Sequence, residues 1–539
     1  MNSKYIAGFI GILAFSLLPE IHAQAQALTK PDKERASIEK MATALQIIDY
    51  FYVEKVDQDK LAEEAIVSML KELDPHSVYI SKKEVDETNE PLVGNFEGVG
   101  IQFQLFHDSI MVISPVPGGP SEKLGILAGD KIIRINNEDA FGKKVTNKYV
   151  LDHLRGPKGT KVTVSILRKG HKGLIDFTIT RDKIPLNSID ATLMLTPDIG
   201  IIKLTRFART SMDEFRESVT KLKAQGMKSL ILDLRSNSGG YLDVAVSLSD
   251  QFLPADKLIV FTEGIRSPKE EFRATFQGAF ETGKLVVLID EGSASASEIV
   301  SGAIQDWDRG LIVGRRSFGK GLVQRPFMLP DSSMIRLTTA RYYTPSGRCI
   351  QKSYEAGADN YFEDVYKRYK HGEFIHADSI HFPDSLRYYT QNHRTVYGGG
   401  GIMPDIFIPL DTSYSSKYYT DIWRKGLLNE FSTQYIDDNR KALSQQYPDV
   451  DTYVAKFFID ESMLNKFIDF AAKGGVPRDD KGLESSSNEI KYVIKGLIAR
   501  NLFTVDAYFQ VITGIDNEVQ KAIDLIHDDS AFKSLAGKK

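Results

Sequence analysis

Cysteine and tryptophan are scarce in this chain of 539 residues, which contains one cysteine, Cys349, and two tryptophans. A single cysteine excludes any disulfide within the chain, so the fold must be stable without covalent cross-links. Hydrophobic residues make up 42% of the sequence and charged residues 26%, as in ordinary soluble proteins. Because 539 residues far exceed the size of one domain, we expect several folded units with substantial cores, and Cys349 packed in one of them.

An excess of charge of one sign is also missing. The chain has 68 Lys and Arg against 72 Asp and Glu, a net charge of −4. This balance gives no electrostatic reason to expect nucleic acid as a partner. The acidic and histidine residues between His371 and His381 meet no established ligand spacing, so we expect neither a metal nor another cofactor.

Long apolar runs are lacking except near the N-terminus. Lys4 is followed by an apolar stretch over residues 5–18, by Pro19 and by a run of small residues at 23–27. The apolar stretch is short for a membrane span, and this order is typical of a cleaved secretory signal peptide, here residues 1–25. An exported protein without disulfides and without another apolar segment is expected in a bacterial periplasm.

The motif of greatest interest begins with an apolar run at residues 285–289, which predicts a buried strand. The sequence Asp-Glu-Gly then leads into Ser293-Ala-Ser295-Ala-Ser297-Glu298, which opens a helical pattern through Trp307. A serine at such a turn lies beside free backbone N–H groups, which stabilise a developing oxyanion. The spacing does not choose among the three serines. Ser295 and Glu298 also match a capping box, so a purely structural role is the alternative.

A lysine flanked by glycines follows in Phe318-Gly-Lys320-Gly-Leu-Val-Gln324. On a regular strand Lys320, Leu322 and Gln324 would share one face. A lysine can act as the base for a serine only if burial lowers its pKa enough to make it neutral. The alternative is a solvated lysine in an ordinary turn.

These motifs, with Gly239-Gly240 after an apolar run and Arg341-Tyr-Tyr-Thr-Pro-Ser-Gly347 downstream, resemble the tail-specific or C-terminal processing peptidases, serine proteases with a Ser-Lys dyad. The resemblance implies that Ser295 is the nucleophile and Lys320 the base, with Gln324 orienting the lysine. It also implies backbone oxyanion donors at Ala296 and at Gly239 or Gly240.

A second resemblance lies upstream, where Phe96-Glu-Gly-Val-Gly-Ile-Gln-Phe103 looks like the carboxylate-binding loop of a PDZ domain. Backbone N–H groups of such a loop hold a terminal carboxylate, and the next strand pairs with an extended peptide. Substrates would then be chosen by their C-terminal tails, with apolar tails the expected choice. The expected groove residues are Gly98, Val99, Gly100, Ile101, Phe103, Val150, Leu151 and Leu154.

The predicted fold is multidomain α+β, with N-terminal helices, a PDZ domain, a crotonase-like α/β protease core and a C-terminal helical region. Pro75 ends the N-terminal helices, and His76 is interpreted as a structural turn histidine. The core carries a long polar insertion that we expect to be solvated. The predicted ranges are 1–25 for the signal peptide, 26–93 for the N-terminal helical region, 94–184 for the PDZ domain, 186–411 for the core, 351–400 for its insertion and 412–539 for the C-terminal helices.

The sequence thus predicts a serine endopeptidase that processes or degrades exported proteins with apolar C-terminal tails. Two alternatives come from other classes: a non-catalytic PDZ scaffold or chaperone, and an acyl-thioester enzyme with a crotonase-like oxyanion pocket. Retention of Ser295 and Lys320 disfavours the first, and export away from coenzyme A disfavours the second. A homodimer through the terminal helices and a regulatory adaptor are partners that the sequence leaves open.

Overall fold

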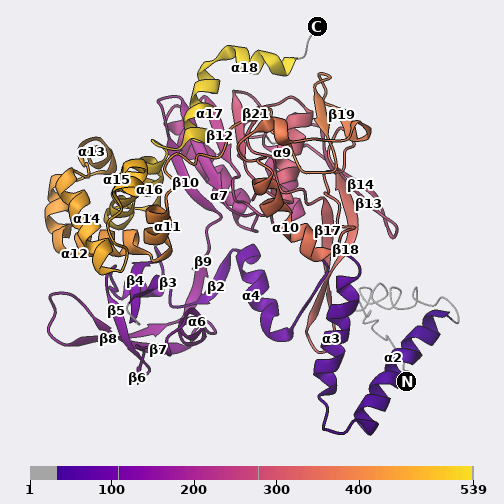
Figure 1. The fold of residues 1–539 in the computed structure, drawn as a ribbon, viewed down its shortest axis with the longest axis horizontal. Coiled ribbons are helices and arrows are strands. Elements are labelled where there is room, and N and C mark those ends of the chain that lie inside the picture. Colours follow the sequence, from indigo (N-terminus) through magenta and orange to yellow (C-terminus); the bar gives the residue numbers. More distant parts are fainter. Residues whose placement is uncertain (1–32, 107–108, 277, 537–539) are drawn as a thin grey trace, which may run out of the picture. The chain divides into compact units, whose positions relative to one another are not determined.

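The computed structural model describes residues 33–106, 109–276 and 278–536, and the chain forms two compact units, 1–73 and 74–539 (Figure 1). In the first unit, α2 (Lys33–Phe51) and α3 (Gln58–Lys71) are amphipathic helices. The end of α3 confirms the helix stop predicted before Pro75. The predicted signal peptide lies outside the described residues. Among the residues described, no helix is both long and apolar enough to cross a membrane.

The second unit begins with the segment that leads into the predicted PDZ region. There a sheet in the order β3-β4-β5-β7-β8, with β6 beside β5, packs its apolar face against α6. A two-stranded ribbon, β2 with β9, joins the two ends of this region. The elements are β1 (Val78–Ile80), α4 (Lys82–Val93), β2 (Asn95–Gly98), β3 (Ile101–Phe106), β4 (Ser109–Pro115), α5 (Pro120–Lys123), β5 (Lys131–Ile135), β6 (Glu138–Asp139), α6 (Asn147–Leu154), β7 (Lys161–Leu167), β8 (Leu174–Thr180) and β9 (Asp182–Pro185).

The core is built on a sheet in the order β10-β11-β12-β15-β16-β21, parallel from β11 onward, with β10 antiparallel at its edge. The predicted α/β character of the core is confirmed, because strands alternate with helices, and the apolar run at 285–289 is a strand over those residues. The elements are β10 (Ile189–Met194), β11 (Ile199–Leu204), α7 (Ser211–Ala224), β12 (Ser229–Asp233), α8 (Leu242–Asp250), β15 (Leu285–Ile289), α9 (Ala296–Asp306), β16 (Leu311–Gly314) and β21 (Ile406–Phe407).

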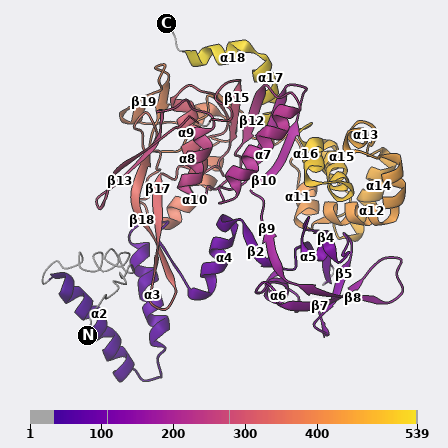
Figure 2. The same cartoon turned by 180° about the vertical axis from the view of Figure 1, so that it is seen from behind.

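Both faces of this sheet are buried, which explains why its strands read as continuous apolar runs. Leu232 and Val287 face the core formed with α7, α8 and α9, whereas their neighbours Ile231 and Val286 face a second core. The second core is completed by α17 (Asn517–His527), close to the C-terminus (Figures 1 and 2). Residues far in sequence from the Ser295 motif therefore complete the central sheet's packing.

A second sheet, in the order β1-β18-β13-β14 with β17 beside β18, carries the segment after Lys320. The insertion follows this sheet and includes α10. We expected the insertion to be solvated, but α10 is partly buried. Arg368 of α10 is buried and donates to the Ser317 carbonyl at 3.0 Å. The elements are β13 (Leu258–Gly264), β14 (Ser267–Arg273), β17 (Leu322–Met328), β18 (Met334–Tyr343), α10 (Ala358–Lys370), η1 (Ala377–Ser379), η2 (Asp384–Leu386), β19 (Arg387–Tyr389) and β20 (Thr395–Tyr397).

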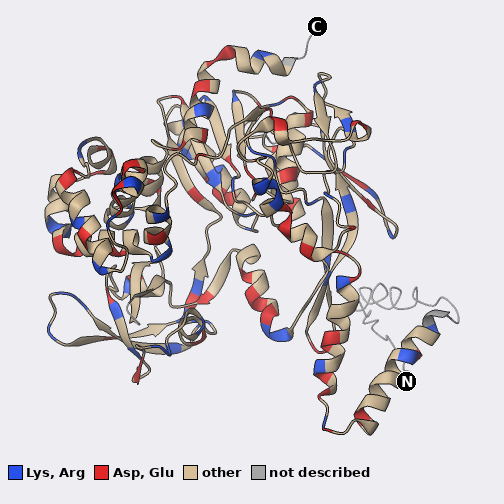
Figure 3. Ribbon diagram, viewed as in Figure 1, with Lys and Arg blue, Asp and Glu red and all other residues tan. Residues whose placement is uncertain are grey.

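The C-terminal region is helical, as predicted, but it has two parts. The helices from α11 to α16 share a core of their own, whereas α17 packs against the central sheet. Figure 3 shows acidic and basic residues interspersed along these helices. The remaining elements are α11 (Lys417–Arg424), α12 (Leu427–Gln446), α13 (Val450–Lys456), α14 (Glu461–Lys473), α15 (Asp480–Leu502), α16 (Val505–Ile512), α18 (Asp529–Lys533) and η3 (Ser534–Ala536).

Candidate active site

Ser295 lies at the turn between β15 and α9, as the sequence predicts. It is the N-cap residue of α9 and has a φ of 54°, which is uncommon for a residue with a side chain. The neighbouring serines are engaged elsewhere: Ser293 donates to the Leu234 carbonyl at 2.8 Å, and Ser297 donates to the Asn237 carbonyl at 2.8 Å. Both are fully buried. The hydrogen bonding therefore distinguishes Ser295 from the other two serines, which the sequence alone could not do.

A cavity of about 820 Å³ brings the predicted catalytic residues together. Its other walls come from α4, from β18 and from the insertion, through Asn89, Arg336 and Phe362. A cavity of this size is large enough to hold several residues of an extended peptide. All six predicted residues line it: Ser295, Lys320, Gln324, Ala296, Gly239 and Gly240.

Glu298 links the serine turn to the lysine loop. Its fully buried carboxylate accepts hydrogen bonds from the backbone N–H of Ser295 at 2.8 Å and of Lys320 at 2.9 Å. It also accepts from the Gly319 N–H at 2.7 Å and the Ser317 hydroxyl at 2.5 Å. Burial raises the pKa of Glu298 to about 7 although these four donors lower it. The capping-box prediction is thus confirmed, and the same carboxylate also holds the backbone of Lys320.

Lys320 lies in an environment that favours its neutral form. Burial, with the charge of Arg336, lowers the pKa of Lys320 to about 8. The Tyr342 hydroxyl lies 2.6 Å from the Lys320 carbonyl oxygen and 3.1 Å from that of Ser295, and thereby fixes the backbone of both residues. Within the described chain, however, no hydrogen bond joins Ser295 Oγ to Lys320 Nζ. Catalytic hydrogen bonds often tighten only when substrate binds.

Gln324 lies in the cavity, but its expected contact with Lys320 is not formed among the described residues. β17 begins at Leu322, and a β-bulge between Val323 and Gln324 breaks the regular alternation that the sequence predicted. The Gln324 amide instead donates to Thr338 Oγ1 at 3.3 Å. The Thr338 hydroxyl donates to Asp74 at 3.0 Å, so this network attaches the Asp74–Ser77 turn to β18.

The loop that carries the predicted oxyanion donors is held against the serine turn by Asn237. The Asn237 carbonyl accepts from the Ala294 N–H at 3.0 Å, and its side-chain oxygen accepts from the Gly239 N–H at 2.9 Å. Over the described residues, the N–H groups of Gly240 and Ala296 have no such acceptor. A Cβ on Gly239 would lie 2.8 Å from the Cβ of Ser295, so glycine is required there. Of the two candidate glycines, Gly240 has the free donor.

His76 and α10 form part of the site that sequence reasoning did not identify. His76 Nε2 lies 2.9 Å from the Tyr361 hydroxyl, and His76 lines the cavity. Burial and the charge of Lys320 lower the pKa of His76 to about 4, so its ring is neutral near pH 7. This hydrogen bond agrees with the prediction that His76 is a structural histidine in a turn. No sequence signal placed Tyr361, which lies in the polar insertion, beside it.

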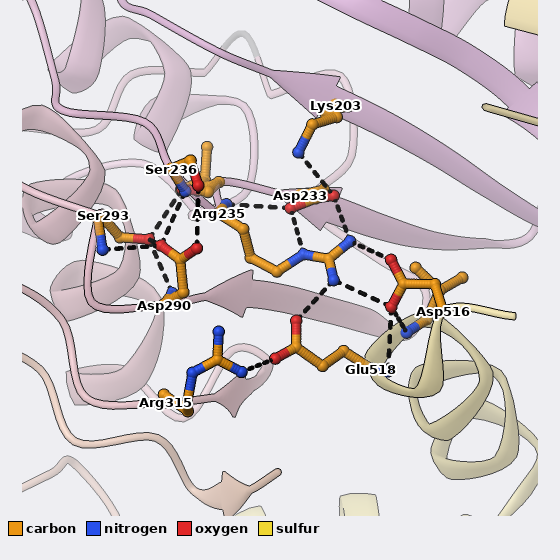
Figure 4. Close-up of polar contacts among 12 residues, drawn as sticks. Lys203, Asp233, Arg235, Ser236, Asp290, Ser293, Arg315, Asp516 and Glu518 are labelled. Atoms are coloured by element: carbon orange, nitrogen blue, oxygen red, sulfur yellow. Dashed lines mark hydrogen bonds and ion pairs between the residues drawn. The ribbon is translucent and has the colours of Figure 1, made fainter. Parts of the chain in front are cut away.

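An ionic network lies at the start of the loop that carries the predicted oxyanion donors. Figure 4 shows the Arg235 guanidinium between Asp233, Asp516 and Glu518, at N···O distances of 2.7, 2.8 and 2.6 Å. Burial alone would raise the pKa of Asp233. The charges of Arg235 and Lys203 outweigh this effect and hold the pKa well below its usual value.

The residue after Arg235 connects this network to the serine turn. The Asp290 carboxylate accepts from the Ser236 N–H at 2.8 Å and from the Ser293 hydroxyl at 3.2 Å. The loop that begins at Ser236 and the turn that contains Ser293 are thereby fixed to one another (Figure 4). The carboxylates of Asp516 and Glu518 lie on the far side of Arg235 (Figure 4).

A second cavity, of about 510 Å³, lies in the predicted PDZ region between β3 and α6. Gly98 is not among its lining residues, because it pairs with Asp182 of β9 and bridges to Arg155. The other predicted groove residues all line it: Val99, Gly100, Ile101, Phe103, Val150, Leu151 and Leu154.

Comparison with known proteins gives four matches to family models. Residues 198–358 match peptidase family S41 and residues 98–179 match the PDZ domain. Residues 15–84 match the N-terminal domain of the activating protease CtpB, and residues 418–504 match a family of unknown function.

Individual relatives extend over longer stretches. A carboxy-terminal-processing protease of Bartonella bacilliformis is 38% identical over 304 residues, which cover 56% of this chain and 69% of that protein. A probable CtpA-like serine protease of Staphylococcus aureus is 34% identical over 354 residues, which cover 65% of this chain and 69% of that protein. A solved photosystem II D1 C-terminal processing protease is 27% identical, covering 57% of this chain and 88% of that one, with a TM-score of 0.33.

Replacement of Arg235 by methionine tests the ionic network. Arg235→Met leaves the buried carboxylates of Asp233 and Glu518 without their shared cation, so we expect the free energy of unfolding to fall by about 3–5 kcal/mol. Urea denaturation measures this loss. The exposed Arg266 provides the matched control, and Arg266→Met is expected to change stability by less than about 0.5 kcal/mol. Equal stability of the two variants would contradict the assignment.

Proposed function

Because the chain belongs to peptidase family S41 and is a serine-type, C-terminal processing protease with a PDZ domain, we propose that Ser295 and Lys320 are its catalytic dyad. The observation that carries the proposal is their shared cavity. There the hydroxyl of Ser295 donates no hydrogen bond among the described residues, unlike those of Ser293 and Ser297, and burial lowers the pKa of Lys320. Substrates are exported proteins whose apolar C-terminal tails occupy the groove between β3 and α6.

The reaction begins when substrate brings Ser295 Oγ within reach of neutral Lys320. The Nζ of Lys320 takes the hydroxyl proton while Oγ forms a bond to the scissile carbonyl carbon. The N–H groups of Ala296 and Gly240 stabilise the resulting oxyanion. The Lys320 ammonium then returns its proton to the departing amine, and water, deprotonated by Lys320, hydrolyses the acyl-enzyme. Tyr342 and Glu298 position the backbone of the dyad, and Gln324 orients Lys320 once substrate is bound.

The PDZ groove has the chemistry that tail recognition needs. β3 is an edge strand of its sheet, so its outer edge is available for a substrate strand to pair. The loop at Gly100 provides backbone N–H groups at the start of that strand, and Ile101, Val150 and Leu154 provide an apolar wall. These features support selection of a free carboxylate attached to apolar residues.

Cleavage of a tailed substrate tests the proposal directly. We expect the protein to cleave a test protein that ends in apolar residues faster than the same protein ending in charged residues. Ser295→Ala removes the nucleophile and should lower the rate at least about a thousandfold. Ser301→Ala, in the same helix, should retain most of the activity. Equal activity in the parent and Ser295→Ala would remove Ser295 as the nucleophile.

The pH dependence of cleavage tests the role of Lys320. Because only the neutral amine can accept the serine proton, kcat should rise with pH and level off above about 8, the pKa of Lys320. Glu298, whose pKa is about 7, ionises in the same direction. Arg336→Gln removes a charge that lowers the pKa of Lys320, so the midpoint should move to higher pH. A midpoint that stays unchanged in this variant would contradict the assignment.

We also propose export to the periplasm and assembly as a homodimer through the terminal helices. The dimer is supported by exposed apolar side chains on α2, including Ile38 at 70% and Phe51 at 74% exposure. Native mass spectrometry of the chain recovered from a periplasmic fraction should give twice the mass of a subunit that lacks about the first 25 residues. Phe51→Glu should shift the assembly to monomer. A full-length subunit would contradict cleavage, and a monomeric parent would contradict the dimer.

A further inference from the structure

The groove between β3 and α6 has one wall that does not belong to the PDZ domain. Asn429 of α12 and Arg500 of α15 line the same cavity as Ile101, Phe103 and Leu154. Both residues belong to the segment 418–504, which matches a family of unknown function. The C-terminal helices therefore contribute directly to the proposed binding site for substrate tails.

Contacts along α12 hold this wall against the PDZ sheet. Lys169 forms an ion pair with Asp438, and a Cβ on Gly129 would lie 2.8 Å from an Asp437 carboxylate oxygen. At the start of the helix, a Cβ on Gly426 would lie 3.2 Å from the side-chain nitrogen of Gln104. Since Gln104 belongs to β3, the C-terminal helices meet the strand beyond Phe103, away from the loop at Gly100.

The two arginines that line the groove differ in their partners. Arg155 forms an ion pair with Glu90, so its charge is already neutralised. Among the described residues, Arg500 donates only to the neutral side chain of Asn429, at 3.2 Å, and its Nε, like that of Arg155, is buried without a hydrogen-bond partner. In the part of the chain that the structure describes, no carboxylate forms an ion pair with Arg500. Burial lowers the pKa of this guanidinium, which reflects its unfavourable desolvation.

An arginine with free donors at a peptide groove is suited to bind a carboxylate, which accepts two parallel hydrogen bonds from the guanidinium. A tail whose terminal carboxylate lies at the Gly100 loop runs antiparallel to β3. At roughly 3.3 Å per residue, it reaches the level of Gln104 about four residues before its end. We propose that Arg500 is a specificity residue that selects tails carrying Asp or Glu about four residues before an apolar C-terminus. This inference rests on the proposed function of the groove.

Peptide binding to the full chain carrying Ser295→Ala, which prevents cleavage, tests the proposal. The probes are two fluorescein-labelled peptides with the same apolar C-terminus and either Glu or Gln four residues before the end. Fluorescence anisotropy should show about 3- to 10-fold tighter binding of the Glu peptide, and raised salt should weaken this preference. Arg500→Gln should abolish the preference, whereas Arg500→Lys should retain part of it. Arg424→Gln, an exposed site in the same region, should leave it unchanged.

Other outcomes separate this inference from the proposed function. Equal affinity of the two peptides for the parent, or a Glu preference that survives in a folded Arg500→Gln protein, would overturn the role of Arg500 alone. The same peptides with an amidated C-terminus test the groove itself. If they bind as tightly as the free acids, or if neither free acid binds, the proposed tail recognition fails and the inference fails with it. Circular dichroism of each variant verifies that it is folded.

Discussion

The buried carboxylate of Glu298 is the interaction on which the rest of the active site depends. It accepts hydrogen bonds from four donors on two segments, the turn of Ser295 and the loop from Ser317 to Lys320. A buried carboxylate is costly to desolvate unless its oxygens are hydrogen-bonded, so the two segments are stable only in the arrangement that satisfies it. The positions of Ser295 and Lys320 relative to each other are thus set through the backbone rather than through their side chains.

Further hydrogen bonds and ion pairs fix the segments that surround this carboxylate. Asn237 and Asp290 connect the loop at Gly240 to the serine turn, and Arg235 connects that loop to carboxylates near α17. On the other side, Asp74 and Thr338 attach the turn at His76 to the strand beside Gln324. The site is therefore built from many separate stretches of sequence, and none of them could form it alone.

Much of this arrangement could be predicted from the sequence. Strands buried on both faces gave clear apolar runs, and the turn at Ser295 lies where the change from strand to helix pattern placed it. The bulge before Gln324 could not be predicted, because one extra residue in a strand leaves no mark on its composition. The choice of Gly240 over Gly239 depends on a hydrogen bond to Asn237. The approach of Tyr361 to His76 and of Arg500 to its cavity depends on tertiary packing. Local patterns carry no information on such contacts.

The position of α17 in the chain also determines when the central sheet can be completed. This helix covers the second face of the central sheet, and the carboxylates of Asp516 and Glu518 hold Arg235. Both residues are synthesised some 220 residues after Ser295. A nascent chain still lacking them exposes the apolar face of its sheet and leaves Arg235 tied only to Asp233. Folding of the central sheet therefore depends on residues that follow the Ser295 motif by a long stretch of sequence.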